Sequence, residues 1–238
     1  MRILLIAGHG AGDSGAVGNG YKEADLTREV VSLLAPKLGQ LCRVDIADIS
    51  KNWYEYLKSH TYNFRNYDYV LEIHFNSYDS LATGTEIYVT TSENGIGVET
   101  AIVQQMCAAV GYKNRGVKRK NYDVISAVKA QGVSSALLEV CFIDSTADIK
   151  TYQSRKNDIV NAIVSGIAEG FGLQRKEETT VPKTLNDISG HYAEKHIQKL
   201  LDYGIVNGDD NGNYRPDDPI TRADAAIIAA NVLTCLGK

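Results

Sequence analysis

The first two dozen residues restrict the fold most strongly. Residues 2–7 form a segment of strand length that is continuously apolar after Arg2, and a glycine-rich loop over residues 8–20 separates it from a helical pattern that begins at Glu23. An all-apolar strand is typical of the buried centre of a sheet that is covered on both faces. Ligands of open α/β sheets bind where strands end and loops begin. His9 lies at this strand end and Glu23 at the start of the helix, so we predict that they are two ligands of one metal ion.

Other interpretations of the glycine-rich loop are weaker. The spacing of a dinucleotide-binding G-x-G-x-x-G loop is met only loosely at Gly8, Gly10 and Gly12, and the chain holds no G-x-x-x-x-G-K-[ST] phosphate loop. The run from Gly12 to Gly15 also lacks the G-x-S-x-G spacing of a nucleophile elbow. A lone histidine at a strand end is more often structural than a ligand, so the metal interpretation depends on partners further along the chain.

Strand-like and helix-like segments alternate along the first part of the chain. Apolar runs and alternating patterns predict strands at residues 2–7, 42–47, 69–75, 84–90 and 135–142, with an edge strand at 121–125. Helical spacing predicts helices at residues 23–38, 51–64, 97–110, 146–152 and 157–171. Such alternation predicts a three-layer α/β/α sandwich with a mostly parallel central sheet.

Composition and charge argue against several classes of protein. The net charge of −4 gives no support to nucleic-acid binding. The four cysteines, Cys42, Cys107, Cys141 and Cys235, include no C-x-x-C pair, so we expect neither a disulfide framework nor a thiolate metal site. No stretch approaches the roughly 20 apolar residues of a membrane helix. The apolar run at residues 3–7 is also too short for a signal peptide, so we expect a chain made without its own leader.

Two further residues complete the expected metal site. His74 lies at the end of one predicted strand, and Glu139 lies inside another strand that is otherwise apolar. A carboxylate inside a buried strand is costly unless it is paired or bound to a metal. Zinc accepts nitrogen and oxygen ligands, and a catalytic zinc keeps one position for water, whose pKa falls to about 7. We predict that His9, Glu23 and His74 bind zinc and that Glu139 acts as general base and then as general acid.

Several separated motifs together resemble a known family. They are ILLIAGHG at residues 3–10, followed by Glu23, EIHFN at 72–76, GTEIY at 84–88, RGVK at 115–118 and LLEVCFI at 137–143. In this order they resemble the catalytic domain of the zinc-dependent N-acetylmuramoyl-L-alanine amidases (amidase type 3) over residues 1–173. The resemblance implies hydrolysis of the amide between the lactyl group of N-acetylmuramic acid and L-alanine in peptidoglycan. It also implies Zn²⁺ on the three predicted ligands and Glu139 as the catalytic carboxylate.

The chain departs from the family pattern at two places near the predicted site. Ile6-Ala7 stand where the family commonly has Asp-Pro, and Glu72 stands where it commonly has a small polar residue. Glu72 shares a strand face with His74, because side chains two residues apart in a strand point to the same side. It therefore either orients this ligand histidine or forms a salt bridge at the rim of the sheet.

Three polar residues near the motifs are weaker candidates for substrate binding. Arg115 and Lys118 belong to a basic run, which either binds the carboxylates of the peptide stem or forms a solvated loop. Asn76 follows the EIHF segment, so it either contacts substrate or makes the turn that ends the strand.

The rest of the chain changes in composition. A polar linker is predicted at residues 174–184, and residues 185–238 resemble one S-layer homology repeat, a small all-α module. Its helices are expected at residues 191–203 and from Thr221 onward. The resemblance implies binding to secondary cell-wall polysaccharide, with Arg222 as the anion contact. Because such repeats commonly occur in threes, we expect this one to dock on the catalytic domain or to assemble with other copies of the chain, a trimer being one form.

The leading hypothesis is therefore a peptidoglycan hydrolase that its last module targets to the cell wall. The expected lack of a leader favours a phage endolysin, made in the host cytoplasm and released onto the wall at lysis, over a secreted bacterial autolysin. Two other classes stay open: a zinc peptidase or deacetylase that acts on another amide, and a non-catalytic wall-binding protein with a degenerate enzyme fold. Defined muropeptides separate them, since an amidase frees L-alanine amino groups without new reducing sugar ends.

Overall fold

The computed structural model describes residues 1–174, 185–209 and 211–235. The chain separates into two compact units, Met1–Lys176 and Glu177–Lys238, and each is described by itself. Apart from Gln174, the predicted linker lies outside the described residues. Within the described ranges, none of the helices combines the length and the apolar character that a membrane crossing requires.

A six-stranded sheet forms the centre of the first unit. Its strands are β1 (Arg2–Ala7), β4 (Arg43–Ile46), β5 (Tyr69–Asn76), β6 (Thr85–Val89), β7 (Asn114–Arg119) and β8 (Ser134–Phe142). They follow the order β4-β1-β5-β8-β6-β7. The first four in this order are parallel, whereas β6 is antiparallel to β8 and parallel to β7. The prediction of a mostly parallel sheet is confirmed.

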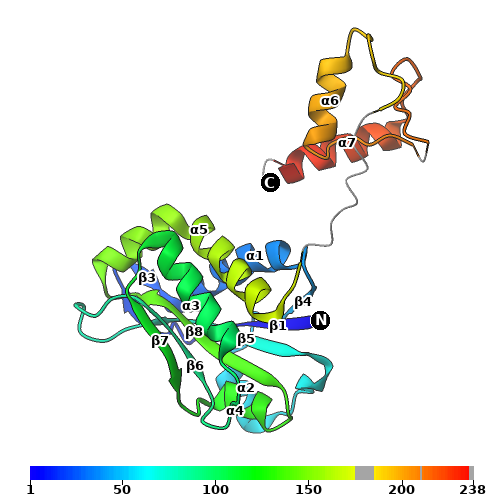
Figure 1. Ribbon diagram of the computed structural model, residues 1–238. Helices are drawn as coiled ribbons and strands as arrows, with labels where there is room; N and C mark the ends of the chain where they lie inside the picture. Colours follow the sequence, from blue (N-terminus) through cyan, green and yellow to red (C-terminus); the bar gives the residue numbers. More distant parts are fainter. Residues whose placement is uncertain (175–184, 210, 236–238) are drawn as a thin grey trace. The chain divides into compact units, whose positions relative to one another are not determined.

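Helices cover both faces of this sheet, which gives the predicted α/β/α sandwich (Figure 1). One face carries α1 (Glu23–Leu38), α3 (Gly97–Val110) and α5 (Thr146–Phe171), and the other carries α2 (Trp53–Ser59) and α4 (Asp123–Lys129). Strand β1 lies between the two layers. Its Ile3 and Leu5 side chains pack into one core cluster and Leu4 and Ile6 into the other, and all four are fully buried. This two-sided burial accounts for the unbroken apolar run.

The edge strand was predicted at the wrong place. Residues 123–125 form the first turn of α4, and the edge strand is instead β7, which includes most of the basic run. The apolar residues of this helix are spaced for a helix face: Val124, Ile125 and Val128 are buried. The charged side chains of β7 concealed its strand character, since edge strands have one side free of neighbours and tolerate such residues.

Two helical predictions differ from the structure in length. The tyrosine-rich segment 51–64 forms only the short helix α2, because the Asn52 side chain accepts the Glu55 N–H at its start and the backbone is extended at His60, where the helix ends. A separate 3-10 turn follows at Phe64–Asn66. The two helices predicted at the end of the unit are joined as α5, with non-helical backbone angles at Arg155 between them.

The second unit contains two helices around a small core. These are α6 (Glu194–Asp202), which begins three residues after the predicted start, and α7 (Arg222–Cys235). The Thr221 hydroxyl accepts the Asp224 N–H at 3.1 Å, which caps α7 as the sequence predicts. The core consists of Leu185, Ile188, Ile197, Leu201, Ile205 and Val206. Helix α7 packs the partly buried Ile228 and Val232 against this core, whereas its Ile227 remains 58% exposed.

Candidate metal centre

The carboxyl ends of the parallel strands and the start of α1 bring the three predicted metal ligands together. His9 follows β1, His74 lies near the end of β5, and Glu23 is the first residue of α1. His9 Nε2 lies 3.1 Å from Glu23 Oε2, and His74 Nδ1 lies 2.9 Å from Glu23 Oε1. One nitrogen or oxygen atom from each residue lies within 4.8 Å of the others. Two imidazole nitrogens and a carboxylate oxygen are a donor set typical of catalytic zinc.

Glu23 is held in place by the backbone as well as by the histidines. Its Oε2 accepts the Ala16 N–H at 2.9 Å, and its Oε1 accepts the Phe75 N–H at 3.0 Å. Burial raises the pKa of Glu23, but its hydrogen bonds to His74 and His9 outweigh burial and bring the pKa below its ordinary value. The site therefore presents a charged carboxylate, as metal ligation requires.

Each histidine has a second carboxylate on its other ring nitrogen. Asp13 Oδ2 lies 2.7 Å from His9 Nδ1 and also accepts the Asn52 side-chain N–H at 2.9 Å. Glu72 Oε1 lies 3.1 Å from His74 Nε2. Such partners fix the tautomer and direct the free nitrogen toward a metal, so the donor set fits zinc. Asp13 was missed from the sequence, because its position four residues after His9 indicates a contact only once the fold of the loop is known.

The glycine-rich loop lets these groups approach one another. A Cβ on Gly8 would lie 2.4 Å from the His74 ring, and one on Gly15 would lie 2.6 Å from the His9 ring. The Arg28 side chain then fixes the loop, donating to the carbonyl oxygens of Gly8 at 3.1 Å and His9 at 3.0 Å. His9 itself has a φ of 62°. A left-handed backbone at a non-glycine residue is strained, and such strain is concentrated at functional sites.

Glu139 lies one strand away from the histidine. It is the register partner of His74 across β5 and β8, so both side chains point to one face of the sheet. Its Oε2 atom is buried and has no hydrogen-bond partner among the described residues. Burial raises the pKa of Glu139 to about 8. The attraction of His74 opposes this shift, and the repulsion of Glu23 adds to it. A carboxyl group with this pKa can both hold and release a proton near neutral pH.

The three weaker candidates for substrate binding meet at one buried carboxylate, that of Glu86. This residue is the register partner of Glu139 across β8 and β6. It is 1% exposed. Its oxygens accept hydrogen bonds from Asn76 at 2.8 Å, from Arg115 at 2.5 Å and from Lys118 at 2.5 Å. Glu86 was missed as a site residue, although it lies within the GTEIY motif. One anion shared by two cations leaves a net positive charge there.

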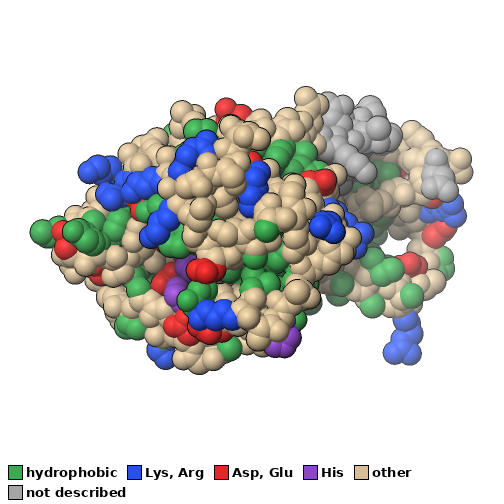
Figure 2. All heavy atoms as spheres, turned by 90° about the horizontal axis from the view of Figure 1, so that it is seen from below, with side chains coloured by type: hydrophobic (Ala, Val, Ile, Leu, Met, Phe, Trp, Pro, Cys, Tyr) green, Lys and Arg blue, Asp and Glu red, His purple; other side chains and the backbone are tan. Residues whose placement is uncertain are grey.

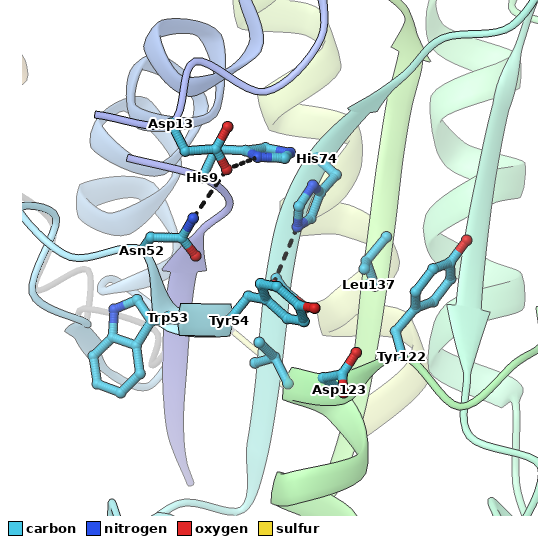
Figure 3. Close-up of a pocket in the computed structure, with 11 residues that line it drawn as sticks. His9, Asp13, Asn52, Trp53, Tyr54, His74, Tyr122, Asp123 and Leu137 are labelled. Carbon is cyan, nitrogen blue, oxygen red and sulfur yellow. Dashed lines mark hydrogen bonds and ion pairs between the residues drawn. The ribbon is translucent and has the colours of Figure 1, made fainter. Parts of the chain in front are cut away.

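The centre is open on one side. On the face seen in Figure 2, histidine and acidic side chains lie together with basic side chains nearby. A pocket extends from His9 and His74 to the beginnings of α2 and α4 (Figure 3). In the second unit, Arg222 is exposed at the first residue of α7.

Comparisons with known proteins agree with this architecture. A family model described as N-acetylmuramoyl-L-alanine amidase matches residues 3–169, and one described as S-layer homology domain matches residues 184–226. The chain is 31% identical over 175 residues to the uncharacterized protein YqiI of Bacillus subtilis (strain 168), covering 69% of this chain and 82% of that protein. It is 27% identical over 238 residues to the endolysin of Bacillus phage SPP1, covering 92% of this chain and 86% of that protein.

A solved structure supports the fold independently. The crystal structure of N-acetylmuramoyl-L-alanine amidase from Clostridium difficile 630 superposes with a TM-score of 0.60 at 18% identity. The match covers 72% of this chain and 96% of that chain. At this identity the likeness establishes the shared fold.

Proposed function

Because the chain belongs to the N-acetylmuramoyl-L-alanine amidase family and is such an amidase, we propose that it cleaves its amide at a zinc centre formed by His9, Glu23 and His74. The observation that carries the proposal is the cluster of these three ligands beside a Glu139 carboxyl oxygen that has no partner in the described part of the chain. The substrate is the amide between the lactyl group of N-acetylmuramic acid and L-alanine in peptidoglycan.

Glu139 moves the proton in the proposed reaction. When bound, zinc would act as a Lewis acid and lower the pKa of water to about 7. Glu139 Oε2 accepts a proton from the attacking water as the oxygen of that water adds to the lactyl carbonyl carbon. The same oxygen then returns the proton to the alanine nitrogen as the C–N bond breaks, which yields a carboxylic acid and a free amine. Asp13 and Glu72 keep the two ligand histidines in the required tautomers.

The products of a defined muropeptide test this reaction against its alternatives. We expect free amino groups on L-alanine and no new reducing sugar ends. Loss of acetate would indicate a deacetylase, and cleavage within the stem would indicate a peptidase. Absence of any product would support the non-catalytic wall-binding alternative.

The Gly8→Ala variant is expected to bind zinc about 10–100-fold more weakly, the range seen when the groups that orient a ligand are lost. The added methyl group would lie 2.4 Å from the His74 ring, and the Gly8 N–H is held by the Ile73 carbonyl at 2.9 Å, so the ring must turn. Equilibrium dialysis measures the affinity. Gly97→Ala is the matched control, because its Cβ would meet nothing within 4 Å. Equal zinc affinity in the two variants would contradict this account.

The cations around Glu86 are proposed to bind the peptide stem. Arg115 and Lys118 are 26% and 37% exposed at the side chain, so each is partly open to a ligand. Their net positive charge suits the carboxylates of the stem, and the Asn76 amide beside them can contact its backbone. Glu86 holds the cations on the same sheet face as Glu139.

The S-layer homology domain is proposed to bind secondary cell-wall polysaccharide through Arg222. The Arg222→Gln variant is expected to bind purified walls about tenfold more weakly, the effect of losing one charge-assisted hydrogen bond. A pelleting assay measures the bound fraction. Lys195→Gln is the matched control, because Lys195 is an exposed cation on α6 of the same unit. Equal loss in both variants would indicate nonspecific attraction and would contradict a role for Arg222.

The biological setting is proposed to be host lysis by a phage. The support is the similarity to the endolysin of Bacillus phage SPP1 along most of both chains. In this setting the protein is made in the host cytoplasm and acts on the wall after release, whereas a secreted autolysin is the alternative.

The exposed apolar residues of α7, including Ile227 at 58%, support docking or assembly with other copies. Light scattering of the full chain tests assembly, and a monomer would contradict it.

A further inference from the structure

We propose that the pocket beside the metal centre is a saccharide subsite, which binds the N-acetylated sugar that carries the lactyl group. This inference rests on the proposed function and adds the direction in which the substrate lies. The pocket begins at His9 and His74 and is walled by Tyr54 from α2 and by Tyr122, the residue before α4. Figure 3 shows these two tyrosines on either side of Leu137. The apolar Leu137 side chain therefore lines the space between two aromatic rings.

One lining residue of this pocket carries an acceptor that has no partner among the described residues. Glu72 lines the pocket and is 4% exposed. Its Oε1 lies 3.1 Å from His74 Nε2 in a hydrogen bond, but its Oε2 is buried without a hydrogen-bond partner among the described residues. A buried acceptor is costly when no donor meets it, so a ligand that enters with an O–H or N–H group is favoured. The hydroxyl and acetamido groups of an amino sugar supply such donors.

The two tyrosines suit the shape of a sugar ring. Each ring has an apolar face for the C–H side of a sugar and a hydroxyl for its polar rim. Tyr54 is 43% exposed, and the Lys58 ammonium lies over one face of its ring at 3.9 Å from the centroid, so a sugar would pack on the other face. Tyr122 is held from behind by an edge-on contact with Tyr88, with 5.1 Å between ring centroids. Its hydroxyl also accepts a hydrogen bond from Lys120 at 3.1 Å. The second wall is therefore fixed before the ligand binds.

The charges on the two sides of the centre separate the sugar from the peptide. The pocket is lined by the carboxylates of Asp13, Glu72 and Asp123. Lys58 and Lys120 border it, over the Tyr54 and Tyr122 rings at 3.9 Å and 4.3 Å from the ring centroids, but neither is among its described lining residues. The lining of the pocket is therefore acidic. It would repel the carboxylates of a peptide stem, whereas a neutral sugar offers donors to it. The cations Arg115 and Lys118 lie instead around Glu86, on the β6 and β7 side of β8. The substrate would lie across β8, with its sugar toward α2 and α4.

Two substrates that carry the same peptide stem test this direction of the bound substrate. One is N-acetylmuramoyl-L-Ala-D-Glu-L-Lys, and the other is the lactoyl peptide that lacks the sugar ring. For the wild-type chain we expect kcat/KM to be at least about tenfold higher with the sugar, and the Tyr54→Leu and Tyr122→Leu variants should each reduce this preference by about tenfold. Tyr192→Leu, which removes an 89% exposed tyrosine of the second unit, is the control and should keep the full preference.

The outcomes separate this inference from the proposed function. If the wild-type chain cleaves neither substrate, the proposed function fails. If it cleaves both with equal kcat/KM, or if both tyrosine variants keep the wild-type preference, the sugar subsite alone is wrong. Inhibition of the wild-type chain by the methyl glycoside of N-acetylmuramic acid is a second measurement that needs no variant. Competitive inhibition that weakens in Tyr122→Leu supports the subsite, and no inhibition overturns it.

Discussion

Replacing Glu139 with glutamine is expected to lower amidase turnover by at least about 100-fold while zinc remains bound. Glutamine keeps the size of the side chain but can neither take a proton from water nor give one to the leaving amine. Glu139 lies one strand from His74, and its Oε2 has no partner among the described residues, so this oxygen is free to take the proton. The three ligands are untouched by the change, which is why the metal should stay.

The measurement is single-turnover amine release from a defined muropeptide, together with the zinc content of each variant. Glu169→Gln is the matched control, because Glu169 is an exposed carboxylate at the end of α5. Wild-type turnover in the Glu139 variant would show that this residue takes no part in the reaction. Loss of zinc from it would mean that Glu139 supports the metal rather than the proton transfer.

Removing a ligand histidine is expected to abolish both zinc binding and turnover. The His74→Ala variant loses the imidazole that faces Glu23 at 2.9 Å, and a site with three protein ligands has no spare donor. It also leaves Glu72 buried without its histidine partner. We therefore expect zinc content near zero and amine release at the level of a reaction without enzyme.

His60→Ala is the control for this experiment. His60 is exposed and stacks on Tyr56 with 4.4 Å between ring centroids, outside the metal centre. Its removal should leave zinc content and turnover unchanged. A His74→Ala variant that keeps zinc and activity would show that the ion lies elsewhere.

The alternation of strands and helices was predictable because the core imposes clear patterns. The all-apolar β1 and the periodic α1 are buried along the lengths that the sequence indicates. The edge of the sheet gave no such signal, since β7 is charged and only half-buried while the apolar residues of α4 suit a helix face. The buried elements at the centre of the fold could therefore be predicted from the sequence, whereas the edge of the sheet could not.

The site shows the same division between local and distant information. His9, Glu23 and His74 stand out because histidines and carboxylates are unusual at the ends of apolar segments. Glu86 could not be assigned in this way, because its role depends on the register that places it beside Glu139 and on cations from the neighbouring strand. Asp13 required the fold of a loop with several left-handed residues, which residue types alone do not determine.

The most direct test of the central claim is a paired measurement on the purified full chain. Zinc content is determined by mass spectrometry, and amine release from Gram-positive walls is followed with and without a chelator, then after zinc is restored. The account predicts about one zinc per chain, release that the chelator stops, and recovery on adding zinc. Amine release from a metal-free chain, or full release in excess chelator, would contradict a zinc centre at His9, Glu23 and His74.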